Sequence, residues 1–153
     1  MVRAQDLMVG DLLRVTKDVC LKKGTIIEVR GIDADNRLPE KGLVGSVSCV
    51  AVGDPDRNSG GIWCKYLEPI PITPEILKKN GFAYYNYGHN DYGWKVDESE
   101  SVVLGEPKDR IFPVGCVCPD LESYYLLSMF GIKYVHELQH VFKNCSINHT
   151  IKL

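Results

Sequence analysis

Apolar and polar residues alternate along several short stretches of the first 70 residues, and turn-forming residues separate these stretches. A period of two places alternate side chains on opposite faces of a β-strand. The alternation predicts strands over residues 11–19, 24–32, 43–52 and 61–68. Short strands at intervals of roughly ten to twenty residues are typical of small barrels. Residues 1–70 are therefore predicted to form an SH3-like antiparallel β-barrel.

Residues 71–81 are predicted to form a short linking helix. Pro69-Ile70-Pro71 ends the preceding strand, because proline cannot donate to a sheet ladder. Thr73-Pro74-Glu75 combines an N-cap residue, a proline at the first helical position and an acid in the first turn. Asn80-Gly81 is typical of a helix end.

The remaining part, residues 82–153, is predicted to form a second antiparallel sheet and a C-terminal helix. Apolar and aromatic runs indicate strands over residues 82–87, 94–96, 101–104, 111–117 and 121–127, and a helix over 132–144. For residues 121–127 a helix is the alternative. The fold class is therefore α+β, with strands first and a helix lying on a sheet. The pattern leaves open whether the two parts pack as one domain.

The C-terminal helix is predicted to have one buried and one exposed face. At about 100° per residue, Val135, Leu138 and Phe142 fall on one apolar arc. His136, Glu137 and His140 fall on the opposite, polar side. We therefore expect the first three to be buried and the last three to be substantially exposed.

Composition and charge narrow the class of protein. The 153 residues are 44% hydrophobic and 25% charged, with a net charge of −2, which is ordinary for a globular protein. Lys and Arg form no basic stripe, so nucleic acid is not an expected partner. The first residues contain no signal-like apolar run, and no apolar segment reaches membrane-spanning length. A cytoplasmic protein without a membrane partner is expected, with its six Cys reduced and several of them buried.

His136-Glu137-Leu138-Gln139-His140 matches H-E-x-x-H, in which two His bind zinc and Glu acts as general base. A catalytic zinc needs a third protein ligand, yet no Asp or Glu follows His140. Cys116, Cys118 or His149 would have to supply it. The main expectation is therefore that the protein has no catalytic residue and no cofactor. In the alternative hypothesis, Glu137 is the catalytic residue and zinc is the cofactor.

Five aromatic residues cluster around a predicted hairpin in the second part of the chain. They are Tyr84, Tyr85, Tyr87, Tyr92 and Trp94. Such a cluster can stack on the bases of a single-stranded nucleic acid or on a sugar. Cross-strand aromatic pairs also stabilise sheets, and Lys95 is the one basic residue nearby. The structural interpretation is favoured, and the aromatic residues remain candidate binding residues.

Asp54-Pro55-Asp56-Arg57-Asn58 begins like a calcium-binding loop. Ser59 stands where that loop needs Gly, and Lys65 stands where it needs a bidentate Glu. We therefore predict a solvated turn at residues 54–58 and no calcium site.

Three stretches resemble a family of short uncharacterised proteins from Bacteroides-type gut bacteria, their prophages and mobile elements. They are residues 3–11 (RAQDLMVGD), 67–82 (LEPIPITPEILKKNGF) and 132–139 (IKYVHELQ). The middle stretch is the most specific. The family's C-terminal stretch resembles V-H-x-L-Q and requires neither Glu137 nor His140. The resemblance implies no activity, and it implies that H-E-x-x-H arises here by accident.

The leading functional hypothesis is a non-enzymatic binding or accessory protein that engages another, unknown protein through the barrel or the aromatic hairpin. The absence of a catalytic signature and the two small β-rich modules support it. A zinc-dependent hydrolase using His136, Glu137 and His140 is the first alternative. Weak binding of single-stranded nucleic acid through the tyrosine-rich hairpin is the second.

Overall fold

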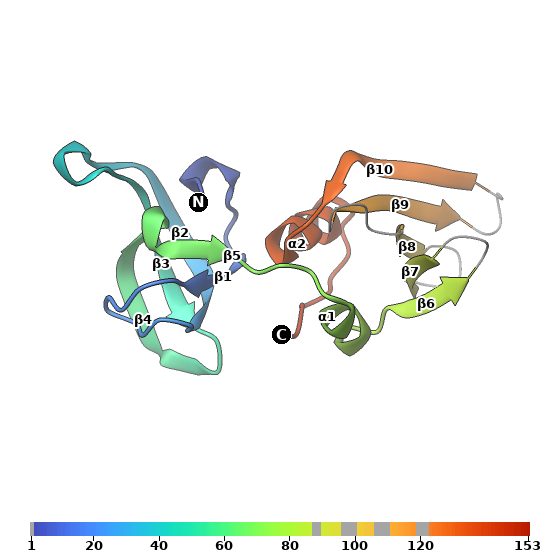
Figure 1. Cartoon of the computed structure of the whole chain (residues 1–153), viewed down its shortest axis with the longest axis horizontal. Helices are drawn as coiled ribbons and strands as arrows, with labels where there is room; N and C mark the ends of the chain where they lie inside the picture. Colours follow the sequence, from blue (N-terminus) through green and yellow to red (C-terminus); the bar gives the residue numbers. More distant parts are fainter. Residues whose placement is uncertain (1, 87–89, 96–100, 106–110, 119–122) are drawn as a thin grey trace. The chain divides into compact units, whose positions relative to one another are not determined.

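The computed structural model describes residues 2–86, 90–95, 101–105, 111–118 and 123–153. The chain divides into two compact units, which are Met1–Ile70 and Pro71–Leu153. We call them the N-terminal unit and the C-terminal unit. Each unit contains one five-stranded antiparallel sheet, and the C-terminal unit also contains the α-helices, so the predicted α+β class is confirmed (Figure 1). No helix in the described part of the chain has the length and apolar character needed to cross a membrane.

The N-terminal unit is a meander of four strands to which a fifth strand returns. The strands are β1 (Leu12–Val15), β2 (Ile26–Leu38), β3 (Leu43–Ala51), β4 (Asp54–Trp63) and β5 (Leu67–Pro69). Three 3-10 turns accompany them: η1 (Ala4–Asp6), η2 (Pro39–Lys41) and η3 (Cys64–Tyr66). The strand order is β4-β3-β2-β1-β5, so β4 and β5 are the edges and the sheet is not closed by hydrogen bonds.

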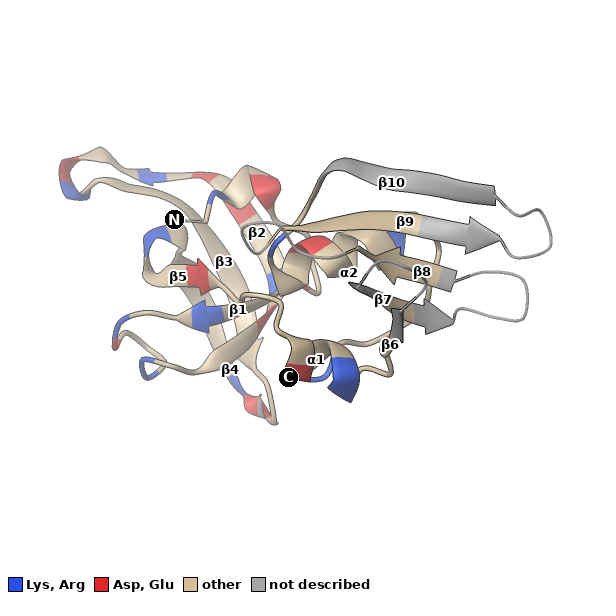
Figure 2. Ribbon diagram, turned by 45° about the vertical axis from the view of Figure 1, so that its right-hand side comes forward, with Lys and Arg blue, Asp and Glu red and all other residues tan. Residues whose placement is uncertain are grey.

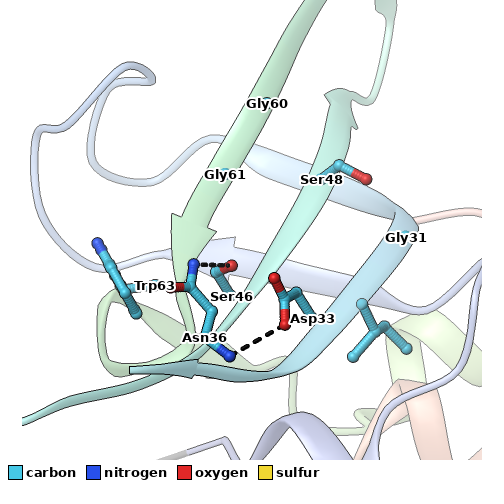
Figure 3. Close-up of a pocket in the computed structure, with 9 residues that line it drawn as sticks. Gly31, Asp33, Asn36, Ser46, Ser48, Gly60, Gly61 and Trp63 are labelled. Carbon is cyan, nitrogen blue, oxygen red and sulfur yellow. Dashed lines mark hydrogen bonds between the residues drawn. The ribbon is translucent and has the colours of Figure 1, made fainter. Parts of the chain in front are cut away.

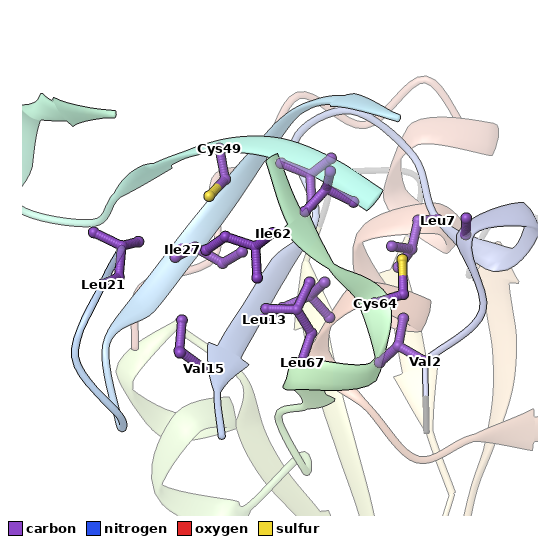
Figure 4. Close-up of a cluster of buried hydrophobic side chains, with 13 residues drawn as sticks. Val2, Leu7, Leu13, Val15, Leu21, Ile27, Cys49, Ile62, Cys64 and Leu67 are labelled. Carbon is purple, nitrogen blue, oxygen red and sulfur yellow. The ribbon is translucent and has the colours of Figure 1, made fainter. Parts of the chain in front are cut away.

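A cluster of apolar side chains fills one side of this sheet (Figure 4). Leu13, Ile27 and Ile62 are fully buried there and come from three different strands. Cys49 and Cys64 are buried in the same cluster, as predicted for thiols that pack as small hydrophobic groups. Burial, followed by the influence of Cys20, raises the pKa of the Cys49 thiol to about 11, so this thiol is protonated at neutral pH.

The predicted turn at residues 54–58 is wrong, because these residues begin strand β4. The chain turns earlier, at Val52-Gly53, where Gly53 has a φ of 87°. Strand β4 pairs only with β3 within the described residues, and its polar residues Asp54, Asp56 and Arg57 are exposed. An edge strand tolerates Pro55, because one side of its backbone needs no ladder hydrogen bond. Residues 54–58 are polar and show no strand pattern, and pairing with β3 stabilises them as a strand.

The C-terminal unit contains an antiparallel meander in the order β10-β9-β8-β7-β6. Its strands are β6 (Ala83–Asn86), β7 (Asn90–Lys95), β8 (Ser101–Leu104), β9 (Phe112–Cys118) and β10 (Ser123–Ile132). Each strand pairs with the next one along the chain. The buried residues Val102, Leu104 and Val114 come from the two strands β8 and β9 near its middle.

The short helix α1 (Pro74–Lys79) begins and ends as predicted. The Thr73 hydroxyl accepts a hydrogen bond from the Ile76 amide at 3.3 Å, and Pro74 occupies the first turn. The helix ends at Asn80, and Gly81 follows with a φ of 83°. Local cap chemistry thus sets both ends of this helix.

Helix α2 (Val135–Asn144) buries the predicted apolar residues Val135, Leu138 and Phe142. It begins three residues later than predicted, because Ile132 still belongs to strand β10. The Phe142 ring stacks on the Phe82 ring, with centroids 6.3 Å apart and an interplanar angle of 16°. These contacts join the helix to the residue that precedes β6.

The predicted exposure of the polar face of α2 is wrong. His136 is only 7% exposed, and Glu137 and His140 are half-buried. Pro71 forms a β-bridge with Tyr134, whose ring stacks on the His136 ring with centroids 5.9 Å apart. Tyr134 lies directly before the helix, and its bridge partner Pro71 belongs to the segment before α1. A helical wheel predicts exposure here because it counts only burial against the sheet and not contacts with residues before the helix.

Candidate functional site

A pocket of about 450 Å³ opens on the sheet of the N-terminal unit (Figure 3). Strands β2, β3 and β4 line it, with small or polar side chains and one aromatic residue. The lining residues are Gly31, Ile32, Asp33, Asn36, Ser46, Ser48, Gly60, Gly61 and Trp63. Its volume falls in the range of about 300–1,000 Å³ that is usual for small-ligand sites.

Two irregularities in strand pairing create the open space beside Ser48. On one side, Val29 pairs with Cys49 but Gly31 pairs with Ser48, so strand β2 carries an extra residue. On the other side, β4 has an extra residue where it passes Ser48, and Gly60 and Gly61 lie there. A β-bulge bends its strand and changes the direction in which nearby side chains point. Because the flanking positions are glycines, no side chain fills the space that the bulges leave.

The glycines differ in how much room surrounds them. A Cβ added at Gly60 or Gly61 would meet no atom within 4 Å, and neither residue has a left-handed φ. A Cβ at Gly31 would lie 2.7 Å from the Ser48 hydroxyl oxygen, so Gly31 allows the two strands to approach closely. Gly60 and Gly61 can therefore accept larger side chains, and Gly31 cannot do so without displacing Ser48.

A third irregularity positions the polar side chains of the pocket. Asp33 pairs with Ser46 and Arg37 pairs with Val44, so β2 has extra residues between these pairs. Asn36 lies in this bulge and donates from Nδ2 to the Ser46 hydroxyl at 2.9 Å. The Asn36 amide donates to Oδ1 of Asp33 at 3.0 Å, which fixes the Asp33 carboxylate locally. Figure 3 shows Asn36 between Trp63 and Asp33.

Several polar groups of the pocket have no partner within the described residues. These groups are Oδ2 of Asp33, the Ser48 hydroxyl and the indole N–H of Trp63. Asp33 is the one charged side chain among the lining residues. Elsewhere in the N-terminal unit, acidic and basic residues are interspersed along the strands (Figure 2). The pocket therefore offers an aromatic ring, one negative charge and unused hydrogen-bonding groups to a ligand.

The residues of this pocket were not among the sequence-predicted candidates. The nearest signal is Gly60-Gly61 at the start of the predicted strand 61–68, since glycine in a strand often marks a bulge or a close approach. Nothing in the local sequence indicates that Gly31 and Asn36 lie beside them. Their proximity depends on the register of three strands.

The H-E-x-x-H residues lie at the start of helix α2, where Glu137 has a structural role. One carboxylate oxygen, Oε2, accepts hydrogen bonds from the Lys133 amide at 2.7 Å and the Tyr134 amide at 2.9 Å. These bonds pair amides that precede the helix, as the Glu of a capping box does. The ring centroids of His136 and His140 are 5.7 Å apart. The Glu137 carboxylate is thus used for capping.

His149 is the one candidate third zinc ligand whose side chain the structure describes, and it does not lie beside this His pair. The His149 ring packs edge-on against Phe142, with centroids 5.4 Å apart. Because Phe142 is two residues after His140, the two point about 160° apart around the helix axis. Burial, followed by the Lys152 charge, lowers the pKa of His149. The side chains of Cys116 and Cys118 lie outside the described residues. Within the described part, no group of three or more His, Cys, Asp or Glu could hold a metal ion.

The capping role of Glu137 leads to a prediction. We expect Glu137→Ala to lower the free energy of unfolding by about 1 kcal/mol, because two amides lose their acceptor. Glu137→Gln retains an acceptor oxygen but loses the charge near the helix N-terminus, so it should cost less. Denaturant unfolding followed by circular dichroism measures both variants. Equal stability of all three proteins would show that the cap contributes nothing.

The described part of the aromatic hairpin packs as a structural cluster. Tyr84 and Tyr92 form a cross-strand pair, and their rings meet edge to face with centroids 5.4 Å apart. Tyr92 also contacts the ring of Phe112, which is buried. Tyr84 is 54% exposed and leaves part of its ring accessible. Tyr87 and the side chains of Tyr85 and Trp94 lie outside the described residues, so the five predicted binding residues are not all placed.

No known protein family, curated protein or solved structure matches this chain.

Proposed function

We propose that this chain is a non-enzymatic binding protein that engages another protein through the pocket of the N-terminal unit. The observation that carries the proposal is the pocket itself, with Trp63 and Asp33 beside a glycine-lined opening. Binding sites commonly combine an aromatic or apolar surface with a few placed polar groups. Strand β3 also offers an apolar contact, because Val44, two residues before the lining residue Ser46, is 58% exposed.

The proposal includes the finer assignments of fold, origin and location. The return of β5 to pair with β1 supports an SH3-like barrel, because it places the last strand of the unit beside the first. The three sequence stretches that resemble Bacteroides-type and prophage proteins support an origin in such a bacterium or mobile element. The cytoplasm is the proposed location.

A selection of phage-displayed random peptides against the full chain tests this function. Peptides that bind the wild type should bind a Gly60→Leu, Gly61→Leu double variant about tenfold or more weakly, because the added side chains occupy the opening. The variant should keep its melting temperature within a few degrees, since neither Cβ meets a neighbouring atom. The function proposed is excluded if no peptide is selected, or if the peptides bind both proteins equally.

Asp56→Leu provides a matched control for this experiment. It places the same bulky side chain on the same strand, at an exposed position that does not line the pocket. Peptide affinity should stay at the wild-type value in this variant. If Asp56→Leu lowers peptide affinity as much as the double variant, a large side chain anywhere on β4 disturbs binding. The pocket would then not be the binding site.

A further inference from the structure

We infer that the pocket of the N-terminal unit binds an arginine side chain of the partner protein. The inference rests on the proposed function, because it names the chemistry that the same site recognises. It follows from the balance of donors and acceptors around the opening, from the single charge there and from the aromatic residue at its edge.

The polar groups of the pocket carry more acceptor lone pairs than donor hydrogens, although the Trp63 indole and the Ser46 and Ser48 hydroxyls are donors as well. The Asp33 carboxylate uses Oδ1 for the Asn36 amide and keeps Oδ2 for a ligand. The Asn36 side chain donates to Ser46 and keeps its own carbonyl oxygen. The Ser48 hydroxyl oxygen is a further acceptor. A guanidinium group has five N–H donors, so it can use more of these lone pairs than a group with fewer donors.

The charge of the pocket favours a cation. Asp33 is the one charged lining residue, and no Lys or Arg lines the pocket with it. No salt bridge to Asp33 occurs in the part of the chain that the structure describes. A cationic ligand would therefore gain a charge-assisted hydrogen bond without displacing a partner of Asp33.

Trp63 distinguishes arginine from the other cationic side chain. Its indole is half-buried at the end of β4, opposite Ser46 in the strand register. A planar guanidinium stacks on an aromatic face and loses little hydration when it does so. The lysine ammonium is compact and strongly hydrated, so placing it against the indole costs more hydration and it lacks the planar shape that stacks there. The pocket should therefore prefer arginine to lysine.

A small-molecule titration tests this inference separately from the proposed function. N-acetyl-arginine amide, N-acetyl-lysine amide and N-acetyl-citrulline amide are each added to the ¹⁵N-labelled full chain. The backbone amide signals of Gly31, Gly60 and Gly61 report on the pocket. The arginine probe should shift these signals at the lowest concentration, and the neutral citrulline probe should leave them unchanged. Citrulline acting like arginine, or no response to arginine, would overturn the inference.

Two matched variants assign the effect to Asp33. Asp33→Asn keeps an oxygen for the Asn36 amide, so the local turn is retained while the charge is lost. This variant should bind the arginine probe about tenfold or more weakly, because a hydrogen bond to a charged group is lost. Asp56→Asn removes an exposed carboxylate of the same unit and should change nothing. Equal losses in the two variants would mean that the probe responds to overall charge, and would overturn the inference.

The two experiments fail in different ways. If peptides bind through the pocket without needing an arginine, the proposed function is supported and the arginine inference is excluded. If the arginine probe binds but no peptide is selected, the arginine site is supported and the proposal of a protein partner is excluded.

Discussion

Phe142→Ala is expected to lower the free energy of unfolding of the C-terminal unit by about 3–5 kcal/mol, the usual cost of removing a buried phenylalanine ring. Phe142 is 1% exposed. Its ring stacks on Phe82, which precedes β6, and meets the edge of His149 in the C-terminal tail. The substitution therefore leaves a cavity between helix α2, the residue before β6 and the C-terminal tail.

Lys143→Ala is the matched control for this prediction. Lys143 is the next residue of the same helix and is exposed, so its loss should change stability by no more than about 0.5 kcal/mol. Urea unfolding curves of the full chain, followed by far-ultraviolet circular dichroism, measure both variants. A Phe142→Ala curve that matches the Lys143→Ala curve would contradict the packing of α2 described above.

Asn80→Ala is expected to destabilise the C-terminal unit by about 1–3 kcal/mol, the cost of leaving backbone groups without partners. The Asn80 side chain is 4% exposed and acts as a hydrogen-bond clamp on the chain terminus. Its Nδ2 donates to the carbonyls of Ile76 and Lys152, at 2.8 and 2.7 Å. Its Oδ1 accepts from the Lys152 amide at 2.6 Å. The neighbouring Lys79 ammonium donates to the Leu153 carbonyl.

Two further variants separate this clamp from a general effect of substitution. Asn80→Asp cannot donate to the two carbonyls and places a negative charge beside them, so it should destabilise at least as much as Asn80→Ala. Asn148→Ala removes an exposed amide from the same tail and should have little effect. Hydrogen exchange of the Lys152 amide measures the clamp directly. Exchange that is unchanged in Asn80→Ala would show that the clamp does not hold the tail.

Local signals in the sequence predicted the elements that depend on local chemistry. The ends of α1 follow from the caps at Thr73 and Asn80-Gly81, because a cap involves residues within one turn. The burial of Leu138 and Phe142 follows from their helical spacing. In each case, the interacting residues lie a few positions apart along the chain.

Features that depend on distant residues could not be predicted in the same way. Strand β4 begins in a polar stretch, and no alternation of apolar residues there indicates its pairing with β3. His136 is buried, and its ring stacks on Tyr134, which is bridged to the distant Pro71. The pocket exists because bulges in β2 and β4 bring glycines to both sides of Ser48. Register between strands set these outcomes, and single-sequence periodicity contains no information on register.

Binding of the partner protein in the pocket beside Trp63 can be followed directly by nuclear magnetic resonance. The chain has two tryptophans, so its indole N–H groups give two signals in a ¹⁵N–¹H spectrum, and Trp63→Phe assigns them. The most direct measurement is a titration of the labelled full chain with a phage-selected peptide. We expect the Trp63 indole signal to shift with the same saturation curve as the Gly60 and Gly61 amides. A peptide that saturates the protein while these three signals stay unchanged would contradict binding in the pocket.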